Sequence, residues 1–310
     1  MGATNREMIQ AGRHSLYVER AGDGSPAVIF DAALGASSLS WALVQPAVAQ
    51  ETLTLSYDRA GLGRSQAGPM PRTASRIADE LRTMLERAKV PPPFVLVGHS
   101  FGGMTARLFA SRYLRDMAGL VLVDPPDARE WTEMSPQNRK KLHTGAWLAR
   151  RGALAARLGI ARAVFWMVRA GAAGPARRIS TSVSGGVLKG NTDNLLVPLQ
   201  KLSREIQLTA ARAWVRPKFY DALASQMESL PESASDIAAV SGLGDLPLVV
   251  LTAANPSPRR FKQQEEAARL SSRGVHRVAR SSGHWIPIDE PELVIDAVLD
   301  VVQQARANAR

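Results

Sequence analysis

The chain has 310 residues, which is enough for one large domain with an insertion or for two small domains. Its 45% hydrophobic and 22% charged residues are typical of a globular protein, and no apolar run reaches the roughly 18 residues that would span a membrane. Cysteine is absent, which excludes disulfides, thiolate metal sites and cysteine nucleophiles. The N-terminus carries no apolar secretory segment, so we expect a cytoplasmic protein.

The first third of the chain alternates short apolar runs with amphipathic stretches. The runs predict strands and the stretches predict helices. Alternation of this kind predicts a mostly parallel sheet covered by helices on both faces. The predicted strands are residues 15–18, 27–30, 53–57, 94–97 and 119–123, and the predicted helices are residues 40–49, 74–88 and 101–113.

The middle of the chain has a different pattern, with little strand signal and much Ala, Arg and Leu. Glycine at positions 145, 152, 159, 171 and 174 predicts short helices broken by glycine. The strand pattern then resumes at 248–251 and 275–278, with helices at 260–270 and 291–305. We therefore predict one α/β core domain, residues 1–127 and 215–310, interrupted by a helical insertion, residues 128–214. Sites in such sheets form beyond the carboxyl ends of the strands, which the insertion would cover.

The net charge of +11 is concentrated in that insertion. Between residues 129 and 178, eleven Lys or Arg stand against two acidic residues. A basic patch attracts phosphate, anionic lipid surfaces or acidic substrates, whereas the simpler interpretation is a solvated helical face. No nucleic-acid-binding module accompanies the charge, so we expect no nucleic-acid partner. Peripheral contact with an anionic surface stays an alternative.

The strongest functional signal is Gly-His-Ser-Phe-Gly-Gly at residues 98–103, directly behind the apolar run 94–97. A strand, a tight turn with a serine and a helix predict a nucleophile elbow, in which the serine hydroxyl projects from a strained bend. Glycines two residues before and after Ser100 remove side chains that would clash with that bend. The positive end of the following helix, with the Phe101 amide, can stabilise a developing oxyanion.

With this elbow, the chain resembles the α/β-hydrolase family over nearly its whole length. The segment Asp58-Arg59-Ala60-Gly61-Leu62-Gly63-Arg64-Ser65 is similar to the D-R-x-G-x-G-x-S segment of that family. There it is a structural glycine turn pinned by an aspartate–arginine pair, so we assign it no chemical role. The resemblance implies an eight-stranded type of sheet with a helical cap inserted after the sixth strand.

The catalytic base that the resemblance implies is His284. Of five histidines, it alone lies between the last predicted strand and the last predicted helix, where the family places its histidine. The family commonly places its acid after the seventh strand, but Asn255 is the nearest polar residue there. Some members keep the acid after the sixth strand, which points to Asp124. We predict Asp124, with replacement by Asn255 as the alternative.

The remaining site residues concern the oxyanion hole and the substrate pocket. The second backbone donor should come from the loop after the strand at 27–30, and we select Leu34 beside Phe101. Apolar residues of the insertion and one beside His284 are candidates for the pocket, although packing of the cap on the core would also explain those in the insertion. These candidates are Trp147, Phe165, Trp166 and Trp285. No metal or cofactor is predicted.

The predicted function is therefore that of a serine hydrolase, similar to a carboxylesterase. It would cleave a small to medium, largely apolar ester through an acyl-enzyme on Ser100, as a monomer or homodimer. Haloalkane dehalogenases and epoxide hydrolases of the family use aspartate at the elbow, so the serine disfavours both. Carbon–carbon bond hydrolases, lactonases, thioesterases and perhydrolases keep the serine and stay open. A non-catalytic ligand-binding member is the alternative from another class.

Overall fold

The computed structural model describes residues 4–170 and 199–308. Its strands form one eight-stranded sheet in the order β1-β2-β4-β3-β5-β6-β7-β8. Neighbouring strands from β4 to β8 run parallel, whereas β2 is antiparallel to both of its neighbours. The predicted, mostly parallel sheet is therefore confirmed. The strands are β1 (Asn5–Ala11), β2 (His14–Ala21), β3 (Ala27–Asp31), β4 (Thr54–Tyr57), β5 (Phe94–His99), β6 (Met117–Val123), β7 (Leu248–Thr252) and β8 (Gly274–Val278).

Consecutive side chains of the central strands pack into two separate hydrophobic cores. In β5, Val95 and Val97 belong to the core on one face of the sheet, whereas Phe94 and Leu96 belong to the core on the other. This alternation follows from the two-residue period of a strand, and both sets are buried because helices cover both faces. The continuous apolar run at 94–97 is the sequence signature of that arrangement.

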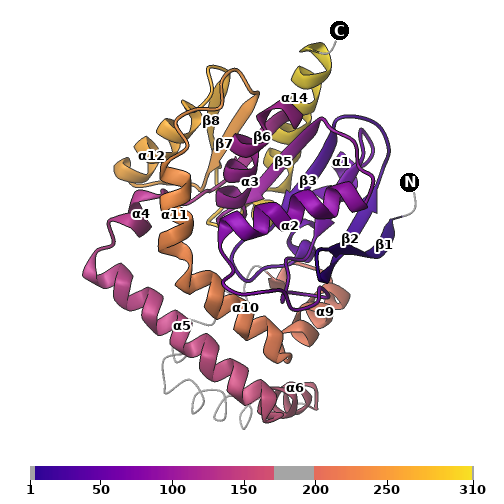
Figure 1. The fold of residues 1–310 in the computed structure, drawn as a ribbon, viewed down its shortest axis with the longest axis vertical. Helices are drawn as coiled ribbons and strands as arrows, with labels where there is room; N and C mark the ends of the chain where they lie inside the picture. Colours follow the sequence, from indigo (N-terminus) through magenta and orange to yellow (C-terminus); the bar gives the residue numbers. More distant parts are fainter. Residues whose placement is uncertain (1–3, 171–198, 309–310) are drawn as a thin grey trace.

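Helices cover each face of the sheet (Figure 1). One face packs against α2 (Ala74–Arg87), α3 (Phe101–Arg112) and α12 (Pro258–Ala268). The opposite face packs mainly against α14 (Pro291–Asn308) and the short α1 (Gln45–Val48). Single turns of helix complete the connections: η1 (Ser38–Trp41), η2 (Leu114–Asp116) and α13 (Ile286–Asp289).

Two elements near the N-terminus differ from the sequence prediction. β1 is not predicted as a strand because its residues are mostly polar, and it lies at the edge of the sheet, paired only with β2 and largely exposed. The helix predicted over residues 40–49 is instead the turn η1 followed by the four-residue α1. Pro46, in the first turn of α1, has no amide hydrogen with which to continue a helix from the preceding turn.

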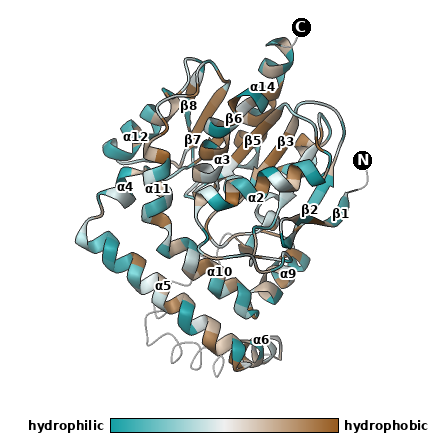
Figure 2. Cartoon of the chain, viewed as in Figure 1, coloured by the Kyte–Doolittle hydropathy of each residue, from teal (hydrophilic) through white to brown (hydrophobic). Residues whose placement is uncertain are grey.

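A series of helices connects β6 to β7. In Figure 1, α5, α6, α9 and α10 lie together beyond one end of the sheet. Figure 2 shows that much of α5 is hydrophilic, whereas the central strands are hydrophobic. The chain leaves β6 at its carboxyl end, the end at which β5 leads into the elbow. Residues 171–198 of the predicted insertion lie outside the described residues, and its boundaries stay a prediction. The helices are α4 (Arg129–Thr132), α5 (Pro136–Arg157), α6 (Ile160–Arg169), α9 (Arg204–Trp214), α10 (Pro217–Glu228) and α11 (Leu230–Ala238).

Glycine does not break α5, which corrects the prediction of short helices in this region. The helix runs through Gly145 and Gly152. A Cβ at Gly145 would lie 2.3 Å from Met227 Cε, and a Cβ at Gly152 would lie 2.5 Å from the Tyr220 ring. Both glycines therefore allow α10 to pack closely along α5. Among the predicted glycines that lie in the described residues, only Gly159, with a positive φ of 77°, separates one helix from the next.

Candidate active site

Ser100 lies at the sharp bend between β5 and α3. Its φ of 53° and ψ of −119° lie outside the regions that residues with a side chain ordinarily adopt. A Cβ at Gly98 would lie 2.4 Å from the Gly102 carbonyl oxygen, and a Cβ at Gly102 would lie 2.4 Å from the Asp31 carbonyl oxygen. These distances are too short for any side chain. The two glycines therefore let the bend close and let α3 begin directly against the loop after β3.

Asp58 and Arg59 have separate partners, which corrects the predicted pairing between them. The Asp58 carboxylate accepts hydrogen bonds from the backbone amides of Ser38 and Arg64, each at 2.8 Å. Arg59 instead forms a buried ion pair with Asp31, with 2.7 Å between Nε and Oδ1. The segment is structural as predicted, but its aspartate closes the glycine turn through backbone amides and its arginine binds the end of β3.

Arg59 also holds the loop after β3 beside the elbow. Its Nη2 donates a hydrogen bond of 3.2 Å to the Ala33 carbonyl, and its guanidinium lies 4.9 Å from the centroid of the Phe101 ring. Leu34, the next residue of that loop, lines the same cavity as Ser100 and Phe101. Within the described residues the Leu34 amide donates no hydrogen bond, and Phe101 is the first residue of α3, where an amide has no acceptor within the helix.

His284 and Asp124 are joined by a hydrogen bond of 2.5 Å between Nδ1 and Oδ2. Asp124 follows β6 directly and is buried, whereas 46% of the His284 side chain is exposed in the loop before α13. Asn255, the alternative from the sequence, is exposed after β7 and makes no hydrogen bond to His284 in the part of the chain that the structure describes. Because Nδ1 carries the proton and donates it in the hydrogen bond to Asp124, Nε2 is the basic nitrogen of the neutral ring.

A cation also contacts the Asp124 carboxylate. Arg260 of α12 places Nη2 3.2 Å from Oδ1 and 3.3 Å from the Asp124 carbonyl oxygen, and its Nη1 lies 3.5 Å from Glu130 Oε1. Burial raises the pKa of the Asp124 carboxyl, but the hydrogen bond from His284 and the charge of Arg260 outweigh burial. The pKa is therefore lowered, and the carboxyl is ionised at neutral pH.

His99 connects the elbow to the His284 loop. Its fully buried ring donates from Nε2 to the His284 carbonyl oxygen at 2.7 Å and lies edge-on to the Trp285 ring at 5.3 Å. Burial lowers the pKa of His99 to about 3, with a smaller contribution from the His284 charge, so the ring is neutral at pH 7. A neutral ring can carry the single Nε2 proton that this hydrogen bond needs. His99 therefore positions the loop that carries His284.

Backbone contacts bring the three predicted catalytic residues to one edge of the sheet. The Ser100 amide donates to the Val123 carbonyl at 2.9 Å, one residue before Asp124, and His99, next to Ser100, binds the His284 backbone. The Ser100 hydroxyl makes no hydrogen bond to His284 within residues 4–170 and 199–308. Such contacts often tighten only when substrate is bound.

A cavity of about 160 Å³ opens at Ser100. None of the four aromatic residues predicted for the pocket lies among its lining residues within the described structure: Trp147, Phe165 and Trp166 lie on α5 and α6, and Trp285 packs against His99. Position in the sequence could have indicated one of the observed lining residues, Trp131, because α4 begins five residues after Asp124, which follows β6. The lining residues are Leu34, Ser100, Phe101, Pro126, Trp131, Lys141, Leu142, Met227 and Leu230.

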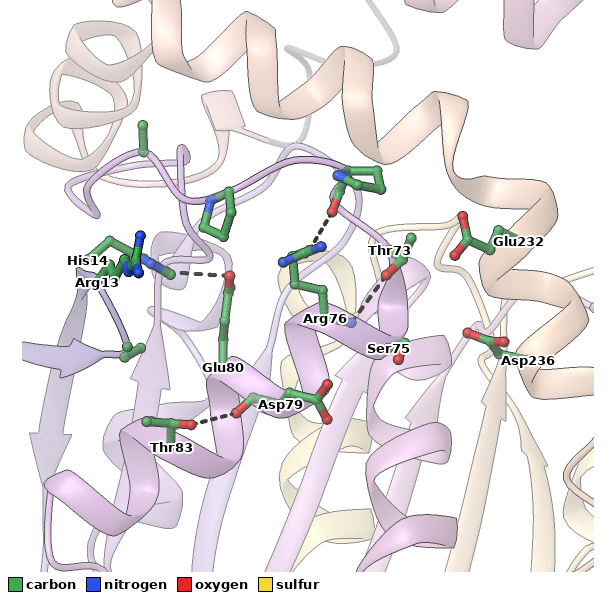
Figure 3. Close-up of a pocket in the computed structure, with 15 residues that line it drawn as sticks. Arg13, His14, Thr73, Ser75, Arg76, Asp79, Glu80, Thr83, Glu232 and Asp236 are labelled. Atoms are coloured by element: carbon green, nitrogen blue, oxygen red, sulfur yellow. Dashed lines mark hydrogen bonds and ion pairs between the residues drawn. The ribbon is translucent and has the colours of Figure 1, made fainter.

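A larger hollow of about 760 Å³ lies elsewhere, over α2 and the turn between β1 and β2, and contains none of the predicted catalytic residues. Figure 3 shows Glu80 of α2 facing His14, and Glu232 and Asp236 of α11 on the far side. Glu80 also forms a two-point ion pair with Arg72 at 2.5 and 2.6 Å. The acid at the centre of this hollow, Glu80, is therefore already paired with a cation.

The described residues contain no cluster of three or more His or acidic side chains arranged to bind a metal ion. Among those residues, no helix has both the length and the apolar character needed to cross a membrane.

Comparisons with known proteins concern the family and the fold. The family model described as "Alpha/beta hydrolase family" matches residues 28–297. The uncharacterized protein YqjL of Bacillus subtilis is 35% identical over 127 residues, which is 40% of this chain and 50% of that protein. The matches span half or less of the length of the first curated relatives.

Solved structures show the same fold. A thermophilic esterase from Thermogutta terrifontis is 20% identical, with a TM-score of 0.67 over 97% of this chain and 99% of that one. The epoxide hydrolase CorEH is 18% identical, with a TM-score of 0.68 over 97% and 98% of the two chains. Identities this low show the fold alone, but the family model covers most of the chain. This protein belongs to the alpha/beta hydrolase family.

Proposed function

We propose that the protein is a serine hydrolase that cleaves carboxylic esters with a small, largely apolar acyl group. The observation that carries the proposal is the 2.5 Å hydrogen bond from His284 Nδ1 to the ionised Asp124, at the same edge of the sheet as Ser100. This bond holds the ring in the tautomer that leaves Nε2 to accept a proton. The strained bend at Ser100 presents the hydroxyl that would supply it.

In the proposed reaction, Ser100 Oγ attacks the ester carbonyl while its proton passes to His284 Nε2. The carbonyl oxygen becomes an oxyanion that the amides of Leu34 and Phe101 stabilise, each donor contributing about 3–4 kcal/mol. Asp124 stabilises the imidazolium by its charge. The imidazolium then gives its proton to the departing alcohol, which leaves an acyl-enzyme on Ser100. Water, deprotonated by His284, hydrolyses this intermediate.

The size and lining of the cavity support a small apolar acyl group. At about 160 Å³, it is smaller than the roughly 300–1,000 Å³ typical of pockets for drug-sized ligands. Its residues Leu142 and Leu230 belong to one hydrophobic cluster that also contains Phe101, and Trp131 packs against that cluster. An aliphatic chain would remove water from this lining, which stabilises the complex by about 25 cal/mol per Å² of apolar surface.

The proposal is tested with p-nitrophenyl esters of two to eight acyl carbons and with a fluorophosphonate that labels active serines. Ser100→Ala should lower kcat by roughly 10⁴-fold or more and abolish labelling. Ser111→Ala, on the same helix α3, is the matched control and should retain both. Near-normal activity in Ser100→Ala contradicts the nucleophile assignment. No turnover of any ester by the folded wild-type protein favours the ligand-binding alternative.

A further inference from the structure

One charged side chain lines the otherwise apolar cavity at Ser100. The other lining side chains are Ser100 itself and apolar residues from five different segments, whereas Lys141 of α5 contributes an ammonium group. Lys141 is exposed, while its neighbour Leu142 is buried in the hydrophobic cluster around Phe101. Lysine commonly lays its aliphatic stem along apolar surface and keeps its charge in water. Lys141 therefore marks the mouth of the cavity.

Lys141 lacks the carboxylate partner that three arginines of the basic segment have. Arg129 pairs with Asp127 and Glu266, Arg150 with Glu228, and Arg157 with Asp221. Within residues 4–170 and 199–308, no carboxylate forms an ion pair with Lys141. Its charge is therefore available to an anionic group of a substrate bound in the cavity.

The surrounding charge favours the same kind of substrate. The helix α5, which contributes Lys141 and Leu142 to the cavity, holds six Lys or Arg and no acidic residue. An excess of positive charge around a cleft raises the local concentration of anions and their rate of association. The positive charge does not raise the local concentration of a neutral ester in this way.

We propose that Lys141 selects esters whose apolar acyl chain ends in a carboxylate, the half-esters of aliphatic dicarboxylic acids. The inference rests on the proposed function of Ser100 as the nucleophile. In this arrangement the ester carbonyl lies at Ser100, the methylene chain lies against the apolar lining, and the terminal carboxylate meets the Lys141 ammonium at the mouth. Lys141 is a specificity-determining residue and takes no part in bond breaking.

The test compares two esters of matched length, mono-p-nitrophenyl adipate and its uncharged methyl ester. The measured quantity is the ratio of their kcat/KM values, anionic over neutral. Because the ammonium is exposed, its interaction with a carboxylate is screened by water, and we expect Lys141→Met to lower the ratio about fivefold. Lys141→Arg should retain it. The wild-type preference should also shrink as NaCl is raised from about 20 mM to about 500 mM.

The matched control is Lys140→Met, because Lys140 is the preceding residue of α5 and is exposed, but does not line the cavity. An unchanged ratio in Lys140→Met with a lowered ratio in Lys141→Met supports the inference. Equal ratios in wild type and Lys141→Met, or equal losses in both variants, overturn it while ester hydrolysis stands. Failure of wild type to turn over either ester, without labelling of Ser100, overturns the proposed function together with the inference.

Discussion

Mild acid should destabilise this protein through His99, the buried histidine that precedes the elbow serine. Burial lowers the pKa of His99 from 6.5 to about 3 in the folded state. Between pH 7 and pH 5 the unfolded chain therefore gains a proton at this residue while the folded chain does not. Because the unfolded state binds more protons, stability is lost as pH falls below about 6.5, and the loss continues until pH approaches 3.

The size of the effect follows from these two pKa values. With an unfolded pKa of 6.5 and a folded pKa of about 3, protonation favours the unfolded state by about 2 kcal/mol more at pH 5 than at pH 7. Any folded-state pKa below about 4 gives nearly the same figure. His99→Gln and His99→Asn keep a side-chain donor but carry no titratable group, so each should lose about 2 kcal/mol less than wild type over this range.

The assay is urea unfolding at pH 7 and pH 5, with the free energy of unfolding extrapolated to water. The difference between wild type and variant cancels other groups with shifted pKa values, such as Asp31, whose pKa burial raises, and His276, whose pKa burial lowers. A difference below about 0.5 kcal/mol between wild type and both variants would show that His99 is not held neutral by burial, and the account of its hydrogen bond to His284 would fail.

Two further predictions concern the Asp124 carboxylate. Asp124→Asn should lower kcat by roughly 10⁴-fold because asparagine favours the wrong tautomer of His284. Asn255→Ala should have little effect on kcat. Steady-state rates that rank the two variants in the opposite order would contradict the assignment of Asp124 and favour Asn255. Arg260→Gln removes a positive charge that lies 3.2 Å from the carboxylate. Loss of this charge favours the protonated form of the nearby imidazole. The acid limb of the kcat/KM profile should therefore move to higher pH by about half a unit to one unit. A pH-rate profile measured from pH 5 to 9 that shows no movement, or movement to lower pH, would contradict this role for Arg260.

The residues that sequence analysis could place are those whose positions follow from local chain geometry. The elbow is one contiguous segment, so residues 94–103 carry the strand, the bend and the helix start together. His284 and Asp124 are distant in sequence, but each lies at the end of a strand or just beyond one. Parallel strands bring such ends to one edge of the sheet, and the 2.5 Å contact between the two side chains has this origin.

The cavity lining and the support of Asp124 depend instead on how separate helices pack. Met227, Trp131 and Lys141 come from three helices, and nothing in the local pattern of any one of them indicates a shared surface. The predicted pocket residues were selected for local apolarity, yet Trp147 and Trp166 are 45% and 58% exposed. The contact of Arg260 with Asp124 joins residues 136 positions apart. Charge alone does not predict such a pair in a chain with 39 Lys and Arg.

The backbone at the carboxyl edge of the sheet shows why strain alone does not identify a catalytic group. Ser100, Asp124 and Asn255 follow the neighbouring strands β5, β6 and β7, and all three have a positive φ, between 44° and 53°. Asp and Asn adopt positive φ more readily than other residues with a side chain, because their short polar side chains hydrogen-bond to the nearby backbone. The positive φ at Asp124 and Asn255 therefore costs little free energy. For serine, such a conformation costs about 1–3 kcal/mol and persists only where the surrounding structure imposes it. Strain therefore distinguishes Ser100, whereas Asp124 is distinguished from Asn255 by its side-chain contacts, above all the hydrogen bond to His284, and not by its backbone.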